Sequence, residues 1–139
     1  MTEGELPDDV LWESFHARTL PEKSWTHRAH LRMAWMTLKK HAIDEAHVLI
    51  RVGIIRLNHA HGLVETAERG YHDTLTYVWL RIVAAMQRET PDFSDSRAFL
   101  EKHTAALAKD APLRHYSRAR LMSLEARARC IDPDLAPLP

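Results

Sequence analysis

The sequence predicts an all-α fold, a single-domain helical bundle of about four main helices with short helices at its ends. Three observations support this fold class. Apolar residues recur every three to four positions, strand-like alternation is absent, and only 4 of the 139 residues are glycine. With 45% hydrophobic residues, a chain of this length can bury the core of one domain.

The expected helices are delimited by capping residues and helix breakers. Ser24 and Ser94 are plausible N-caps, Gly62 is a C-terminal stop, and Pro91 lies beyond the end of another helix. In chain order, a first short helix is predicted at residues 8–18, and the four main helices cover residues 25–41, 44–61, 71–89 and 95–109.

The last third of the chain has a weaker helical pattern. After Pro112, short turns are expected near residues 114–121 and 123–130. Residues 121–139 therefore combine short turns with an extended, proline-rich tail. No linker or repeat interrupts the chain, so residues 1–139 are predicted to form a single helical domain.

Charge and cysteine content point away from several classes of protein. The chain has 19 basic and 19 acidic residues, a balance that argues against nucleic-acid binding and against binding to an anionic membrane surface. The first residues do not resemble a signal peptide, and no apolar run reaches the length of a membrane span. A single cysteine, Cys130, fits a reducing compartment, so a cytoplasmic location is expected.

Histidine is the unusual residue, at 10 of 139. In the segment WTHRAHLRMAW, His27 and His30 continue the apolar stripe of their helix rather than oppose it. His61 ends the inward stripe of the third helix, and His72 begins that of the fourth. Because short connections make neighbouring helices antiparallel, these four histidines are expected at the same end of the bundle.

A group of neutral imidazoles at one end of a bundle is typical of a transition-metal site. His27, His30, His61 and His72 are the candidate ligands, and Zn, Fe, Cu or Ni would fit. Carboxylates of Glu65, Glu68 or Asp73 could complete or orient the ligand set.

A metal site with an open coordination position would suit an enzyme acting on a small molecule. Asp73 and Tyr71 are the candidate catalytic residues. The remaining residues expected to line the pocket are Thr76, Trp35, His115 and Tyr116.

Three metal-free alternatives stay open. The histidines could perform acid–base chemistry, or the chain could be a non-catalytic ligand-binding or protein-interaction module with a histidine-lined pocket. Each histidine could also be purely structural.

Arg28 and Arg32 are expected on the solvated side of their helix, and His41 and His47 are expected to be exposed. A bundle of this size could form a homodimer, although no stripe in the sequence demonstrates one.

Several motifs occur together in an order that resembles a family of small, uncharacterised bacterial proteins. They are WTHRAHLRMAW, AHG, YHDTLT and HYS, followed by the closing PDLAPLP. The family pattern is F-x-H-x-x-H-[LV]-R-x-A-W, A-H-G and Y-H-E-T-[IL]-T. Asp73 departs from it, since the family has Glu at that position. The resemblance implies that one set of residues belongs together without implying an activity: His27, His30, Ala34, Trp35, His61, Gly62, Tyr71, His72, Thr74 and Thr76.

Overall fold

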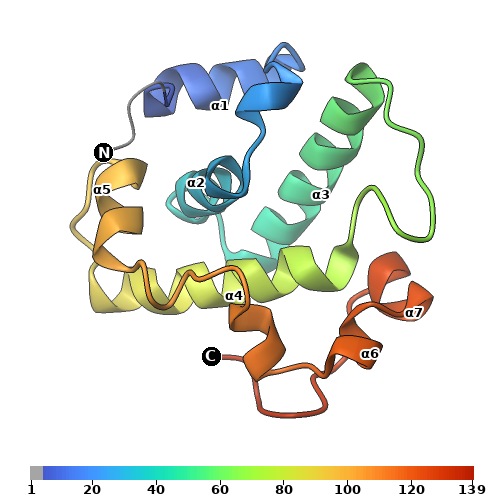
Figure 1. Cartoon of the computed structure of the whole chain (residues 1–139). Helices are drawn as coiled ribbons and strands as arrows, with labels where there is room; N and C mark the ends of the chain where they lie inside the picture. Colours follow the sequence, from blue (N-terminus) through green and yellow to red (C-terminus); the bar gives the residue numbers. More distant parts are fainter. Residues whose placement is uncertain (1–4) are drawn as a thin grey trace.

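The computed structural model describes residues 5–139 (Figure 1). Over this range the chain forms seven α-helices, two 3₁₀ helices and no strand, which confirms the predicted all-α class. The elements are α1 (Asp8–Ala17), η1 (Glu22–Ser24), α2 (His27–Leu38), α3 (Ile43–Ala60), α4 (Asp73–Glu89), α5 (Ser96–Lys102), η2 (Ala111–Arg114), α6 (Arg118–Leu121) and α7 (Leu124–Ala128).

Most helix ends lie close to the predicted positions, but the end of α5 and two caps differ. Thr26, not Ser24, caps α2, and its Oγ1 accepts a first-turn backbone N–H at 3.1 Å. Asp95, not Ser94, caps α5. The sequence offers neighbouring residues with the same capping chemistry, which explains both displacements. Gly62 follows α3 with a φ of +75°, so its role as the helix stop is confirmed.

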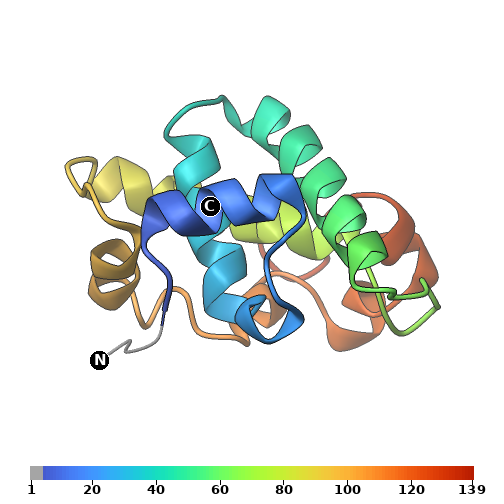
Figure 2. The same cartoon turned by 90° about the horizontal axis from the view of Figure 1, so that it is seen from above.

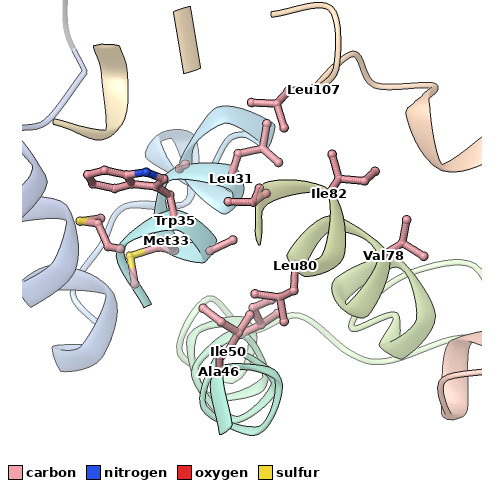
Figure 3. Packing of buried hydrophobic residues seen from close by; sticks show 14 of the residues in the cluster. Leu31, Met33, Trp35, Ala46, Ile50, Val78, Leu80, Ile82 and Leu107 are labelled. Carbon is pink, nitrogen blue, oxygen red and sulfur yellow. The ribbon is translucent and has the colours of Figure 1, made fainter. Parts of the chain in front are cut away.

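Helix α2 is at the centre of the bundle and packs against α1, α3, α4 and α5 (Figures 1 and 2). Every side chain from Leu31 to Thr37 is buried. Figure 3 shows Leu31 and Trp35 of α2 in the same apolar cluster as Ile50 of α3 and Leu80 of α4. Burial of these side chains is the main source of stability for such a bundle.

Arg32 contradicts the expectation that it would be solvated. Its side chain is buried, with Nη2 donating to Asp8 Oδ1 at 2.9 Å and Nε donating to Ser96 Oγ at 2.7 Å. These bonds tie the N-terminal segment and α5 to α2, because a buried guanidinium is tolerated only when its donors are paired. Arg28 is partly exposed and pairs with Glu5 at 2.7 Å.

Helices α1 and α3 approach each other at a glycine. A Cβ atom built on Gly53 would lie 2.3 Å from Cε2 of Phe15, a distance that real Cβ atoms do not show. Phe15 is buried and fills this position. The absence of a side chain at Gly53 therefore allows the aromatic ring of α1 to rest on the α3 backbone.

Helix α5 ends at Lys102 rather than at residue 109 as predicted. The Thr104 hydroxyl donates to the backbone carbonyl oxygens of Glu101 at 3.0 Å and Leu100 at 3.4 Å. Such bonds from a threonine compete with helical backbone bonding, which gives a physical reason for the early end.

The C-terminal tail is held against the bundle by hydrogen bonds. The Leu135 N–H donates to the His115 carbonyl at 2.9 Å, and Arg81 Nε donates to the Pro139 carbonyl at 2.8 Å. Helix α7 packs against α4, so the short C-terminal elements cover one side of α4.

Candidate functional site

A cavity of about 320 Å³ lies between α2, α3 and α4. Two tryptophans and several aliphatic side chains make most of its wall, and three histidines contribute polar atoms. The full lining is Trp25, His27, His30, Ala34, Ile50, Ile54, Gly70, Tyr71, His72, Leu75, Thr76, Trp79 and Leu80. The volume is within the range of small-molecule sites, and the lining contains no Asp, Glu, Lys or Arg.

His30 is held by the start of its own helix. Its Nδ1 lies 2.8 Å from the Thr26 carbonyl oxygen, so Nδ1 carries the proton and Nε2 is the acceptor nitrogen of a neutral ring. The ring stacks on Trp25, with centroids 3.8 Å apart. Burial lowers the pKa of His30 to about 4, so the ring is uncharged at neutral pH.

His27 has the one buried side-chain nitrogen or oxygen in residues 5–139 that lacks a hydrogen-bond partner, its Nε2. The ring packs edge-on against Trp79, with centroids 4.9 Å apart. Burial lowers the pKa of His27, an effect that the nearby Leu107 carbonyl partly offsets. An unpaired buried polar atom is costly and rare, which makes His27 a candidate binding group.

His72 also lines the cavity, but both of its nitrogens are occupied. Nδ1 accepts the Leu75 N–H at 3.0 Å, which makes His72 the N-cap of α4. Nε2–H donates to the Leu121 carbonyl at 2.7 Å. This ring therefore joins α4 to α6, and neither lone pair nor N–H is left for a ligand.

Asp73 does not line the cavity and instead forms a buried network next to it. Its Oδ1 accepts the Tyr71 hydroxyl at 2.6 Å and lies 3.0 Å from Nε2 of His47. Burial, with the bond to Asp73, raises the pKa of Tyr71. His47 is half-buried, so the expectation that it would be exposed is wrong. It is in phase with Ile50 on the inward stripe of α3, a signal that could have placed it.

His61 is not part of this cavity. It lines a separate depression, and its Nε2 lies 2.8 Å from the Leu20 carbonyl oxygen. Helix α3 has 18 residues and α2 has 12. At 1.5 Å per residue, α3 is longer by roughly 9 Å, and it also diverges from α2 (Figure 2). The prediction that the four histidines lie together in one site is therefore wrong for His61.

Three more residues predicted for the pocket lie elsewhere. Trp35 is buried against Phe99, with ring centroids 5.7 Å apart. The Nδ1 of His115 lies 2.9 Å from the Pro137 carbonyl oxygen, and the Tyr116 hydroxyl donates to the Ile131 carbonyl at 2.5 Å. The last two hold the C-terminal segment, which the helix pattern could not reveal.

The predicted acidic ligands are also used differently. Glu65 accepts the backbone N–H of Tyr71 at 2.9 Å, beside Gly70, and Glu68 is exposed in the same loop. Among residues 5–139, no group of three or more His, Cys, Asp and Glu side chains has an arrangement that could hold a metal ion. The cavity offers two imidazoles, His27 and His30, each of which keeps its Nε2 atom free of hydrogen bonds within the fold.

Comparison of the chain with known protein families, curated proteins and solved structures yields no match. In the part of the chain that the structure describes, no helix combines the length and apolar character needed to cross a bilayer.

Proposed function

We propose that this protein binds an uncharged, largely apolar small molecule in the cavity between α2, α3 and α4. The observation that carries the proposal is the lining, in which aromatic and aliphatic walls surround imidazoles and no ionised side chain. His27 and His30 supply the polar recognition. Tyr71 and Thr76, both predicted for the site, also belong to the lining, and their hydroxyl groups donate to Asp73 Oδ1 and to the His72 carbonyl.

The lining favours a neutral ligand over a charged one. An ion that enters an apolar cavity loses its hydration and finds no opposite charge there, which costs several kcal/mol. Burial of an aromatic or aliphatic group against Trp25 and Trp79 is favourable in the same place. A volume of about 320 Å³ corresponds to on the order of ten water-sized groups, so the ligand is small.

One polar group on the ligand would be recognised by His30. With Nδ1 bonded to Thr26, the ring is fixed in the tautomer whose Nε2 accepts a hydrogen bond. A ligand hydroxyl or N–H is therefore favoured. In the catalytic form of the proposal, Tyr71 is the reactive group in the cavity, and Asp73 orients its hydroxyl.

Calorimetry with four small aromatic probes tests this proposal. Phenol should bind, and its methyl ether anisole should bind about five-fold more weakly, because a net hydrogen bond contributes roughly 1 kcal/mol. Benzoate and benzylammonium should show no measurable binding. Leu75→Trp, which fills the cavity, should abolish phenol binding, whereas His16→Ala on the exposed side of α1 should preserve it. Equal affinity for phenol and benzoate, or phenol binding that survives Leu75→Trp, would refute the proposal.

A metal-dependent form is the second candidate, and the orientation of His30 favours it. Metal-binding histidines usually donate their other N–H to a carbonyl or carboxylate, as His30 does to Thr26. His27 lies one helical turn away, so in this form the two imidazoles would hold the ion and the remaining positions would come from water or the small molecule. His72 does not fit, because both of its nitrogens are bonded.

Metal content and titration distinguish the two candidates. Protein purified without a histidine tag would be analysed for transition metals and titrated with Zn²⁺, Ni²⁺, Cu²⁺ and Fe²⁺. Stoichiometric uptake that is lost in His27→Ala and in His30→Ala, and retained in His41→Ala, would support the metal-dependent enzyme. Uptake well below one equivalent would remove that candidate and leave the metal-free pocket.

A cytoplasmic location belongs to the same proposal, because Cys130 has no second cysteine to pair with.

A further inference from the structure

Helix α3 carries an apolar stripe on its outer side. Val48, Val52 and Ile55 are 58%, 46% and 40% exposed, and Leu49 beside them is 42% exposed. Spacings of four and three residues place these side chains on one face of the helix. Figure 2 shows α3 at the edge of the bundle, and the exposure of these four side chains places them on its uncovered side.

The opposite side of the same helix forms part of the core. Ala46, Ile50, Ile54 and Leu57 are buried there, and two of them line the cavity. Helix α3 is therefore apolar on two sides, whereas a helix at the surface of a monomer normally has one apolar stripe. A contiguous exposed apolar stripe of this kind marks a protein interaction site.

Charge on the outer stripe is arranged in a self-complementary way. Glu45 lies seven residues before Val52, and His59 lies seven residues after it, so all three share the face. Arg56 is beside His59 at the same end, and Glu45, Arg56 and His59 are all exposed. Within its own copy, Glu45 Oε1 also pairs with Nδ1 of His41 at 2.5 Å. An antiparallel copy of the helix, related by a two-fold axis at Val52, would bring Glu45 next to His59 and Arg56.

We propose that two copies of this chain form a homodimer by antiparallel packing of their α3 helices about a two-fold axis near Val52. In this arrangement Val48 and Leu49 face the opposite copy's Ile55, and the acidic end of each stripe meets the basic end of the other. The antiparallel orientation also aligns the two helix dipoles favourably. The inference is independent of the cavity and its ligand.

Analytical ultracentrifugation of the full chain, from micromolar to millimolar concentration, tests the dimer. The native chain should sediment as a concentration-dependent dimer. Val52→Glu should raise the dimer dissociation constant by roughly ten-fold or more, because the axis would place two carboxylates together in an apolar contact. The matched control is Val64→Glu in the loop after α3, an exposed apolar residue outside the stripe, and it should leave the dimer intact.

Exchanging the charged residues at the two ends of the stripe tests whether the two α3 helices are antiparallel. Glu45→Arg alone should weaken the dimer, and Glu45→Arg combined with His59→Glu should restore it. Circular dichroism would confirm that each variant keeps its helices, and phenol binding should be unchanged in Val52→Glu because that side chain does not line the cavity. A native chain that stays monomeric throughout, or a dimer unaffected by Val52→Glu, would overturn the inference.

Discussion

The start of α2 and the start of α4 both bring histidine to the same cavity, yet they use it differently. At α2, the Thr26 hydroxyl caps the helix, so His27 and His30 keep nitrogens that the fold does not consume. At α4, no Ser, Thr, Asn or Asp occupies the N-cap position, and the His72 ring caps the helix itself. The residue that caps a helix thus decides whether a nearby histidine is structural or available.

Removing the His72 ring should have the largest effect on stability. His72→Ala deletes the N-cap of α4 and leaves the buried Leu121 carbonyl without its donor, which should cost about 2–4 kcal/mol in the free energy of unfolding. Urea denaturation measures this loss. His72→Asn should recover about 1 kcal/mol, because asparagine caps helices well. A loss no larger than that of His30→Ala would contradict the contrast between the two helix starts.

Acid should destabilise the protein through His30. The pKa of His30 falls from 6.5 in the unfolded chain to about 4 in the folded one, so the unfolded chain binds the proton first as the pH drops. Stability is therefore complete above pH 6.5 and declines toward pH 4, by roughly 3 kcal/mol from this ring.

Unfolding curves for His30→Leu isolate that contribution. Burial also lowers the pKa of His27 and His72, so the native chain and the variant both lose stability in acid. The decline should be smaller in the variant by the share that His30 supplies. Identical pH profiles for the two proteins would show that His30 is readily protonated in the folded state.

The buried network at Asp73 should contribute less. Tyr71→Phe removes the hydroxyl that donates to Asp73 and leaves His47 as the neighbouring side-chain partner of that oxygen. We expect a loss of about 1–2 kcal/mol, measured by denaturation. His47→Ala combined with Tyr71→Phe should lose more than the sum of the single changes, because the carboxylate then has neither side-chain donor. Strict additivity would show that the two donors act independently.

The smallest effect should come from the cap of α2. Thr26→Ala removes the hydroxyl that accepts an N–H of the first turn and should cost about 1 kcal/mol. The backbone carbonyl that orients His30 remains, so phenol should bind the variant as it binds the native chain. Weakened binding would show that the cap also holds the imidazole in place.

Much of the fold can be predicted from patterns in the amino-acid sequence alone. The apolar stripes predicted the all-α class and most helix boundaries, and the stripe phase placed His27, His30 and His72 on inward faces. His61 lies outside the cavity because α3 is longer than α2 and diverges from it. Helices that follow one another through short connections are expected to be antiparallel, but this expectation does not determine the angle between their axes.

Hydrogen-bond partners were the part that the sequence could not provide. Arg32 is buried because Asp8 and Ser96, far away in the chain, supply acceptors for its N–H groups. The same limit applies to His72, whose partner Leu121 belongs to a short C-terminal helix. Periodicity tells which side chains point inward, whereas tertiary contacts decide which of their polar atoms stay free.

The contact between Gly53 and Phe15 has a consequence for how this sequence can change. A side chain at position 53 collides with the ring at position 15, so either substitution alters what the other position tolerates. We expect the two positions to vary together, because a larger residue on α3 requires a smaller residue on α1. Libraries that vary the two sites together should yield folded pairs of compensating size that single-site libraries miss.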